Sequence, residues 1–465
     1  MTSPTTIAGT SWEGWAEALP PSCPEHVVES PADPAEAAVR LAGSGLGGEY
    51  VVYERAGTWT YAAAPAATLT LDAESVVARC GNQAVVQPLG AAPLEQVAEA
   101  LARLPHQDWR VYGWAAFELA HLLHADTGNP GDAPLLHLML PAIEVTLTPG
   151  TARIRTADPE HLPLLAKALA GSTSSAGTGL TDAENLVRSA PGPYRHAVAR
   201  TVADIQAGLV QKTVLSRPLP LPSAPDLGAT YLTGRRANTP ARSFLLDLGG
   251  WRAAGFSPET VVEVEAAGRR VSTQPLAGTR ALGTNAEDTA RLRAELLGDP
   301  KEIHEHALSV RLAVDELTAI CRPGTVVVED FMTVLERGSV QHLASRAAGQ
   351  LAEDRSPWDA FAALFPAITA TGCPKPEALR TISRHESEPR GLYAGAVFTA
   401  DAAGSLDAAL VLRTVFERDG RGWLRAGAGI MGQSTPEREW EETCEKLRSV
   451  APHLHLRPET PPAQP

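Results

Sequence analysis

The sequence predicts a globular protein of the α+β class. Stretches with β-branched or alternating apolar residues occur along the whole chain, and between them lie segments with the spacing of amphipathic helices. Hydrophobic residues make up 44% of the 465 residues and charged residues 20%, which is the balance of a soluble protein with a sizeable core. No stretch approaches the roughly 20 apolar residues that span a bilayer. We therefore expect a cytoplasmic protein without a membrane segment.

The first part of the chain predicts structural elements but no catalytic constellation. Residues 1–30 are rich in Pro, Ser and Thr and predict an irregular start. Strands are expected at 50–53 and 84–87, a helix at 94–104, and a strand that runs into a helix at 111–124. Residues 171–179 (GSTSSAGTG) have the composition of a flexible linker. The sequence thus predicts an N-terminal part over 1–180, separate from a second region at 190–455.

The second region alternates strands with helices. Strands are predicted at 213–215, 244–248, 261–264, 325–328 and 408–415, and helices at 193–210, 289–297 and 301–319. A last helix begins at a cap signal at 434–437 (STPE) and runs through 446. Residues 456–465 are predicted to form a disordered tail.

Charge and cysteine content exclude several classes of protein. The formal net charge of -14 argues against non-specific nucleic-acid binding, which needs a basic face. The five cysteines are scattered and lack any CxxC spacing, so neither a disulfide framework nor a structural zinc site is expected. The start of the chain shows no basic segment followed by an apolar run, and therefore no signal peptide.

Two acidic helix faces are candidates for a metal site. Glu302 and Glu305 are three residues apart, as are Glu439 and Glu442, so each pair projects from one side of a helix. Four carboxylates that converge would repel one another unless a divalent cation lay between them, and hard oxygen ligands suit Mg²⁺. The alternative for each pair is a solvated helix face with salt bridges. His304 and His306 suggest zinc only weakly, because the HExxH order is absent.

Other candidates are two runs of small residues and three isolated ionisable groups. The runs at 274–280 (QPLAGTR) and 425–430 (RAGAGI) predict loops whose backbone N–H groups could bind carboxylates, although each could be an ordinary tight turn. Neither matches a P-loop or a dinucleotide-binding turn, which argues against ATP and NAD. Lys212 and Arg413 adjoin apolar strand segments, and Glu259 follows a Ser-Pro turn. A lysine and a glutamate in one pocket are plausible acid–base partners.

These segments occur in an order that resembles the chorismate-utilising enzymes, a family that includes the anthranilate synthase large subunit, isochorismate synthase and salicylate synthase. The resemblance covers about residues 190–455. It rests on seven ordered motifs, at 211–217 (QKTVLSR), 255–259 (GFSPE), 275–280 (PLAGTR), 299–306 (DPKEIHEH), 338–342 (GSVQH), 390–395 (RGLYAG) and 437–446 (EREWEETCEK). The N-terminal part matches only loosely, at 111–118 (VYGWAAFE).

The resemblance implies a fold and a set of site residues. The fold is that of anthranilate synthase component I, with antiparallel β-sheets packed face to face and helices outside. The metal ligands for Mg²⁺ would be Glu302, Glu305, Glu439 and Glu442, which hold it against the ring carboxylate of chorismate. Residues around the substrate would be Gly278, Thr279, His342, Thr369, Tyr393, Arg413, Gly427, Ala428, Gly429 and Lys446.

Lys212 indicates which reaction to expect. Family members that add ammonia resemble one another in having Gln there, whereas a lysine suggests that a base activates water. The resemblance then implies that Lys212 removes a proton from water attacking C2 and that Glu259 protonates the departing C4 hydroxyl, which gives isochorismate. Thr369 resembles the salicylate synthases, which eliminate pyruvate from bound isochorismate. Salicylate often enters siderophore biosynthesis or antibiotic assembly.

Two alternatives stay open. An isochorismate synthase would stop after the addition of water, and an amination enzyme would make an aminodeoxychorismate-type or anthranilate-type product. Lys212 and the absence of a fused glutaminase argue against amination. We therefore expect a monomer that binds chorismate and Mg²⁺ and needs no glutaminase subunit, nucleic acid or membrane.

Overall fold

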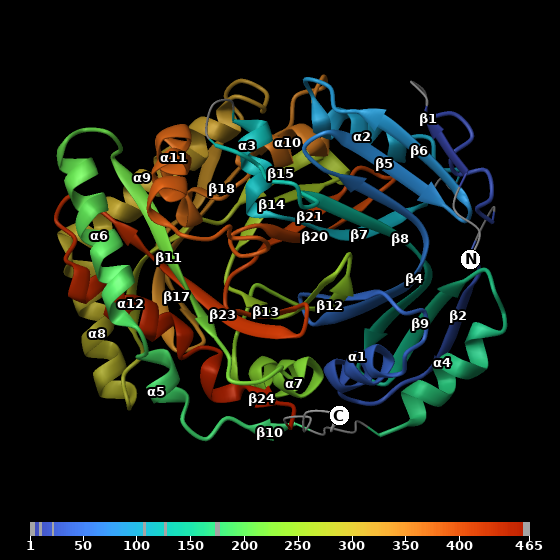
Figure 1. Cartoon of the computed structure of the whole chain (residues 1–465), viewed down its shortest axis with the longest axis horizontal. Helices are drawn as coiled ribbons and strands as arrows, with labels where there is room; N and C mark the ends of the chain where they lie inside the picture. The colour runs from blue at the N-terminus through green and yellow to red at the C-terminus, as the bar shows by residue number, and fades with distance from the viewer. Residues whose placement is uncertain are drawn as a thin grey trace, which may run out of the picture.

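The computed structural model describes residues 5–8, 12–20, 23–105, 108–124, 128–172 and 177–458. A hydrogen-bonded sheet network of 22 strands winds through the middle of the molecule, and the helices lie around it (Figure 1). Its described pairings are antiparallel except for the parallel pair β1–β6. The predicted α+β class with antiparallel sheets is therefore confirmed.

The part of the chain before residue 173 contributes nine strands and four α-helices to the described structure. The strands are β1 (Thr5–Ala8), β2 (Glu25–Glu29), β3 (Tyr50–Arg55), β4 (Thr58–Leu71), β5 (Ser75–Cys80), β6 (Gln83–Pro88), β7 (Arg110–Ala115), β8 (Leu136–Thr148) and β9 (Thr151–Thr156). The helices are α1 (Pro34–Gly43), α2 (Pro93–Leu101), α3 (Ala120–Leu123) and α4 (His161–Ala170).

The remainder of the described chain contributes fifteen strands and eight α-helices, among them those that line the cavity described below. The strands are β10 (Thr178–Gly179), β11 (Lys212–Pro220), β12 (Arg242–Leu248), β13 (Trp251–Ser257), β14 (Thr260–Glu265), β15 (Arg270–Thr273), β16 (Leu276–Ala281), β17 (Val327–Arg337), β18 (Val340–Gln350), β19 (Gly372–Cys373), β20 (Ala396–Asp401), β21 (Leu406–Leu410), β22 (Thr414–Arg418), β23 (Arg421–Ile430) and β24 (His455–Leu456). The helices are α5 (Ala183–Val187), α6 (Pro191–Gln206), α7 (Leu227–Ala237), α8 (Ala286–Gly298), α9 (Pro300–Thr318), α10 (Pro357–Leu364), α11 (Lys375–His385) and α12 (Pro436–Leu447).

The two predicted parts of the chain share this sheet. Strand β3 pairs with β12, and β7 pairs with β20, so strands from before and after residues 171–179 lie next to each other. In Figure 1, the helices α6, α8, α9 and α12 gather on one side of the molecule. None of the described helices is long and apolar enough to cross a membrane.

Local sequence signals fix the start of the two acidic helices. Helix α9 begins after Asp299, whose side chain accepts hydrogen bonds from the N–H groups of Lys301 and Glu302, with Pro300 in the first turn. Helix α12 begins after Thr435, whose hydroxyl accepts from the N–H of Arg438. Because these caps set the first turn of each helix, they also set the direction of the glutamates that follow.

Several sequence predictions need correction. The start of the chain is not irregular throughout: β2 pairs with β9, and the Trp12 and Trp15 side chains are buried in the core. The strand predicted at 408–415 is two strands, because the chain bends at Arg413, where φ is 50°. The predicted tail begins too early, since Leu456 belongs to β24. Residues 459–465 lie outside the described part of the chain, as do residues 173–176 of the predicted linker.

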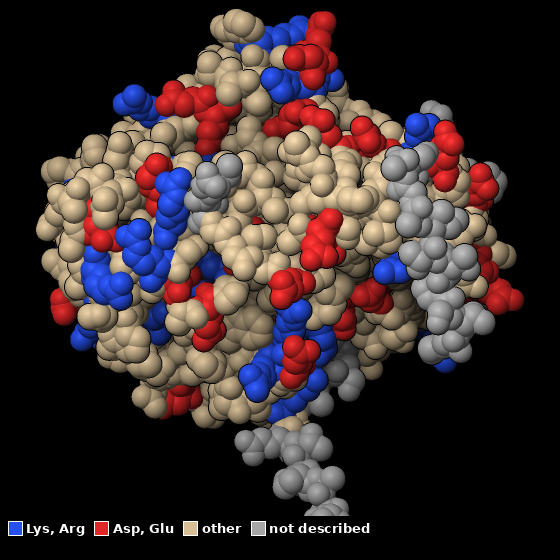
Figure 2. Space-filling view, turned by 45° about the horizontal axis from the view of Figure 1, so that its top comes forward, with Lys and Arg blue, Asp and Glu red and all other residues tan. Residues whose placement is uncertain are grey.

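The acidic and basic side chains are mixed on the surface. On the face in Figure 2, red acidic and blue basic side chains lie beside one another across the described residues. The net charge of -14 is therefore not concentrated in one acidic lobe on that face.

The core includes an aromatic cluster that packs α10 against β20. Phe398 is fully buried, and its ring centroid lies 5.2 Å from that of Phe361 and 6.0 Å from that of Trp358. We expect Phe398→Ala to reduce the free energy of unfolding by about 3–5 kcal/mol, because it leaves a cavity between helix and sheet.

Urea unfolding followed by tryptophan fluorescence measures this change. Val327→Ala is the control, since Val327 is 53% exposed on β17 and its truncation should change stability by no more than about 0.5 kcal/mol. Equal effects of the two substitutions would contradict this assignment of the core.

Candidate active site

One cavity brings together most of the residues predicted from the sequence. It lies among β16, β18 and β23, the ends of α9 and α12, and the turns before β14, β20 and β22. Predicted site residues that line it are Glu259, Gly278, Thr279, Glu305, His342, Thr369, Tyr393, Arg413, Gly427, Gly429, Glu442 and Lys446. Apolar walls come from Val214, Leu276 and Leu412. A largely apolar pocket with a few convergent charges is typical of a site for a small organic anion.

Four predicted residues do not line the cavity directly. Lys212, Glu302 and Glu439 are buried behind it and are described below. Ala428 lies on β23 between two glycines that do line the cavity, so its side chain points to the opposite face of the strand. Only its backbone can contribute to the site.

Lys212 is the first residue of β11 and is only 1% exposed. Its Nζ lies 2.9 Å from Glu305 Oε1 and donates to Ser309 Oγ at 3.3 Å, both on α9. The cavity-facing carboxylate of Glu305 thus connects the lysine to the cavity. Lys212 is therefore not in bulk solvent, as an acid–base role for this residue requires.

Glu259 lies at the turn between β13 and β14 and is 2% exposed. The Leu276 N–H donates to Glu259 Oε2 at 2.9 Å, and the Thr369 hydroxyl donates to Oε1. Burial raises the pKa of Glu259 to about 7, although the Thr369 hydroxyl and the Leu276 N–H oppose this by stabilising the carboxylate. The charge of Lys212 also acts on Glu259, so the two groups share one electrostatic environment.

Arg413 is a buried cation without a carboxylate partner among the described residues. Its guanidinium donates to the Arg337 carbonyl at 2.8 Å and to His342 Nε2 at 2.5 Å. Burial and the charge of Arg337 lower the pKa of Arg413 to about 9. A guanidinium in this situation gains free energy when an anion enters the cavity.

Tyr393 lies between two arginines that a single glutamate holds. The guanidinium carbons of Arg390 and Arg425 lie 5.8 and 5.7 Å from the centre of its ring. Both arginines donate to Glu386 at 2.6 Å, and Arg425 also lines the cavity. The two arginines, which Glu386 holds, thereby fix the position of the Tyr393 ring.

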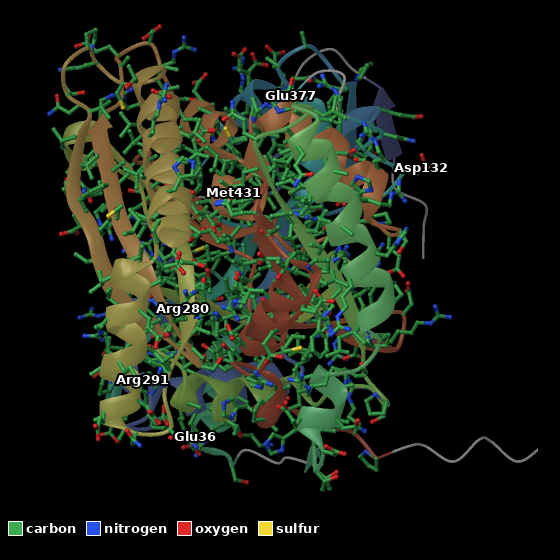
Figure 3. All side chains as sticks on the ribbon, turned by 90° about the vertical axis from the view of Figure 1, so that its left-hand side faces the viewer. Glu36, Asp132, Arg280, Arg291, Glu377 and Met431 are labelled. Atoms are coloured by element: carbon green, nitrogen blue, oxygen red, sulfur yellow. The ribbon has the colours of Figure 1, made fainter. Side chains whose placement is uncertain are left out.

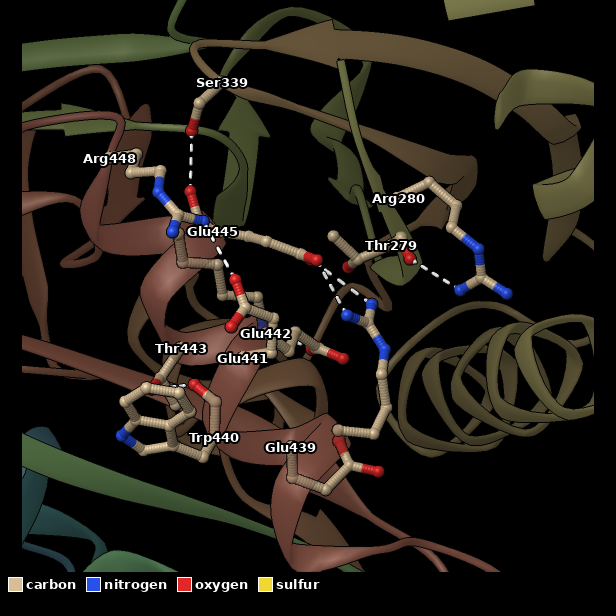
Figure 4. A network of polar contacts seen from close by, with 12 residues as sticks. Thr279, Arg280, Ser339, Glu439, Trp440, Glu441, Glu442, Thr443, Glu445 and Arg448 are labelled. Carbon is tan, nitrogen blue, oxygen red and sulfur yellow. Dashed lines mark hydrogen bonds and ion pairs between the residues drawn. The ribbon is translucent and has the colours of Figure 1, made fainter. Parts of the chain in front are cut away.

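The four predicted metal ligands come from the two acidic helices, Glu302 and Glu305 from α9 and Glu439 and Glu442 from α12. Figure 4 shows Glu439 and Glu442 on α12 in one view with Thr279 and Arg280. Burial raises the pKa of Glu302, and the charges of Glu442 and Glu305 raise it further. Burial and the charge of Glu442 likewise raise the pKa of Glu439. These mutual effects mean that the carboxylates are electrostatic neighbours, as the spacing in each helix predicts.

Each of these carboxylates also has a cation beside it. The ion pairs are Glu302–Arg280 at 3.1 Å, Glu305–Lys212 at 2.9 Å, Glu439–Lys301 at 3.1 Å and Glu442–Lys446 at 2.9 Å. Arg280, at the end of β16, is labelled in Figure 3, which shows the side of the molecule with α6, α8 and α9. No three His, Cys, Asp or Glu side chains in the described chain are grouped closely enough to hold a metal ion.

The donor set nevertheless fits a hard divalent cation. Glu439 Oε2 is buried and has no hydrogen-bond partner among the described residues. An unsatisfied carboxylate oxygen is costly to bury, and a cation with oxygen ligands would relieve that cost. His306 gives the zinc alternative no support, because both of its ring nitrogens are hydrogen-bonded, to the Ala277 carbonyl and the Ser345 hydroxyl.

The two runs of small residues are strands, not the predicted loops. They lie mainly in β16 and β23, and their glycines allow neighbouring segments to approach closely. The predicted tight turns are absent from these two strands. A side chain at Gly429 would collide with the Glu305 carboxylate, and one at Gly427 would meet the Leu215 carbonyl and the Tyr393 hydroxyl. Gly278 alone among these has a positive φ, 83°, and lies where β16 and β18 shift register.

Sequence reasoning missed residues that the structure places around the site. Ser309 lies one turn beyond Glu305 on the same face of α9, and that spacing could have identified it. Lys301, Arg280 and Arg425 fall inside the motifs that were singled out, but their partners come from distant segments and could not be read from the sequence.

Sequence comparison connects this chain to proteins of known activity. The family described as chorismate binding enzymes matches residues 48–452. A salicylate synthase from Mycolicibacterium paratuberculosis is 42% identical over 94% of this chain and 96% of its own length. Anthranilate synthase component 1 from Mycolicibacterium smegmatis is 31% identical over 84% of this chain and 82% of its own.

Solved structures share the fold. The menaquinone-specific isochorismate synthase from Escherichia coli superposes with a TM-score of 0.71 at 22% identity, covering 93% of this chain and 95% of that one. Anthranilate synthase component I from Streptococcus pneumoniae gives 0.69 at 24% identity, covering 85% and 92%. The predicted fold of anthranilate synthase component I is confirmed. From the match along most of its length and from this shared fold, the chain belongs to the family of chorismate binding enzymes.

Proposed function

We propose that this protein is a Mg²⁺-dependent salicylate synthase, which converts chorismate through isochorismate to salicylate and pyruvate. The observation that carries the proposal is the pair of buried groups Lys212 and Glu259, whose charges act on each other. Glu259 lines the cavity, and Lys212 lies behind it, beside the cavity-lining carboxylate of Glu305. Such a pair suits a reaction in which one group takes a proton and another gives one. The 42% identity to a protein named salicylate synthase supports the same reaction.

In the first step, water adds to the ring and the C4 hydroxyl leaves. Lys212 acts in its neutral form, so the ammonium paired with Glu305 must first lose its proton. The neutral amine then takes a proton from the water as the water oxygen bonds to C2. The ring double bonds shift, the C4–O bond breaks, and Glu259 donates its proton so that the hydroxyl departs as water. One water enters and one leaves, so the product is isochorismate, an isomer of the substrate.

In the second step, pyruvate leaves from the bound isochorismate. The C2 hydrogen moves to the methylene carbon of the enolpyruvyl group while the bond between the ether oxygen and C3 breaks, and the ring becomes aromatic. Because this transfer is intramolecular, the cavity has to hold the side chain folded over the ring and needs no further acid or base. Arg413 and Tyr393 would bind the enolpyruvyl carboxylate, and both line the cavity.

The metal would be held by Glu302, Glu305, Glu439 and Glu442. When bound, Mg²⁺ supplies positive charge that neutralises the ring carboxylate and fixes the ring in the cavity. Lys446 and the backbone at Gly278 and Thr279 would complete the surroundings of that carboxylate.

Two other activities are alternatives. An isochorismate synthase would use the same Lys212 and Glu259 and release the first product. The Thr369 hydroxyl donates to Glu259, and Thr369 is the residue at which the sequence resembles the salicylate synthases, so this contact favours the full reaction. An amination enzyme has less support, since it would not need a buried lysine at the start of β11.

Incubation with chorismate and Mg²⁺ tests the reaction directly. We expect salicylate and pyruvate in equal amounts, with Lys212→Ala reducing turnover by about 10²–10⁴-fold, the range for loss of a general base. Chromatography measures the products, and Lys167→Ala on α4 is a control that removes an exposed lysine. Accumulation of isochorismate alone would identify the shorter reaction, and full turnover by folded Lys212→Ala protein would refute the assigned base.

The pH dependence tests Glu259 as the acid. A general acid must be protonated, so kcat/KM should fall as the pH rises through about 7, the pKa of Glu259. Thr369→Val removes a hydrogen bond that stabilises the carboxylate, which raises the pKa of Glu259 and moves the fall in rate to higher pH. Thr369→Ser keeps the hydroxyl and should leave the profile in place. A profile that stays unchanged in Thr369→Val would contradict this role.

Substitution of one acidic residue tests the metal site. Glu439→Gln should weaken Mg²⁺ binding at least about tenfold, a loss that even residues behind metal ligands cause. Isothermal titration calorimetry measures it. Glu441→Gln is the matched control, because Glu441 lies on the same helix but pairs with Arg188 and Arg448 instead. Equal binding by both variants would remove Glu439 from the metal site.

A further inference from the structure

Three cavity residues form a chain of hydrogen bonds that fixes the positions of protons. Arg413 Nη2 lies 2.5 Å from His342 Nε2, and His342 Nδ1 lies 3.0 Å from the Thr279 hydroxyl. His342 is 5% exposed and Thr279 4%, so water does not compete freely for these groups. All three residues line the cavity.

The arginine determines which nitrogen of the histidine carries the proton. A guanidinium has only donors and no lone pair, so Nε2 of His342 has to accept. The neutral ring then carries its proton on Nδ1. Burial lowers the pKa of His342 well below its ordinary value, and the charges of Arg413, Lys446 and Arg337 lower it further, so the ring is neutral.

The proton on His342 Nδ1 also determines the direction of the hydrogen bond between His342 and Thr279. The Gly278 backbone also forms a hydrogen bond with the His342 ring. Because Nδ1 of His342 carries a proton, the ring can donate on that side to the Gly278 carbonyl and the Thr279 hydroxyl oxygen, and the hydroxyl cannot donate back to Nδ1. The Thr279 N–H is also engaged, since it donates to Glu302 Oε2 at 2.9 Å, which holds the residue at a second point. The hydroxyl proton of Thr279 is left for a group in the cavity.

We propose that His342 is a positioning residue which, held in its Nδ1–H tautomer by Arg413, makes the Thr279 hydroxyl a hydrogen-bond donor to a carboxylate of the bound substrate. The inference rests on the proposed function, in which that substrate is chorismate. With the opposite tautomer, the threonine would donate to Nδ1 and turn an oxygen lone pair toward the carboxylate. The direction of two hydrogen bonds thus decides whether Thr279 attracts or repels the anion.

Nitrogen NMR of the ligand-free protein tests the tautomer without any reaction. With ¹⁵N-labelled histidine, the His342 signals are those missing from His342→Gln protein, and we expect the proton on Nδ1. Arg413→Met removes the obligatory donor and should shift the ring toward the Nε2–H form. Arg337→Met removes a neighbouring cation whose side chain donates to the Pro258 and Glu336 carbonyls and not to the ring, and it should leave the tautomer unchanged. A proton on Nε2 in the unaltered protein would overturn the inference.

Kinetics with chorismate test the consequence for binding. Thr279→Val should raise KM for chorismate about 10-fold or more, as for a lost hydrogen bond to a charged group, with a smaller effect on kcat. Thr279→Ser should restore KM. His342→Leu should raise KM in the unaltered background but add little to Thr279→Val, because both act through one hydroxyl.

The outcomes separate this inference from the proposed function. Fully additive effects of His342→Leu and Thr279→Val on KM would overturn the inference while leaving a working salicylate synthase. Absence of any chorismate turnover would overturn the proposed function and, with it, the identity of the carboxylate, whereas the NMR result on the tautomer would stand.

Discussion

The ion pair between Lys212 and Glu305 connects strand β11 to helix α9 beside the cavity. Lys212 begins β11, the strand that pairs with β23, and Glu305 projects from α9 to meet it at 2.9 Å. Both side chains are largely buried, so neither charge could stay there alone. The glycines of β23 are needed for the same reason, since a side chain at Gly429 would occupy the space of the pair. Sheet, helix and small residues are thus adapted to one buried contact.

This arrangement explains how a protein of net charge -14 can accommodate an anion. The buried acidic groups of α9 and α12 each have a basic partner, which keeps their charges from dominating the cavity. Arg413 has no such partner among the described residues and is available to a ligand. Local pairing, more than the total charge, therefore decides what the cavity attracts.

Much of the site was predictable from the sequence because the residues lie in short motifs with a fixed local geometry. The spacing of Glu302 and Glu305 on one helix face is an example, and the cap at Asp299 sets where that face begins. The order of the seven motifs along the chain indicated the family, and the family in turn implied the fold. What spacing could not supply were contacts between segments far apart, such as the pairing of Glu439 with Lys301, 138 residues away. The glycine-rich runs were misread as loops because a glycine that permits close packing in a sheet looks the same in sequence as one that permits a turn.

The sheet that joins both parts of the chain has a consequence for synthesis. Strand β7, at residues 110–115, lies between β8 and β20, and β20 begins only at residue 396. On the ribosome, one edge of β7 therefore stays open until nearly 300 further residues have been translated, and an open edge is a template for wrong pairing. The N-terminal strands therefore complete their pairing only after the later strands that lie beside them have been made.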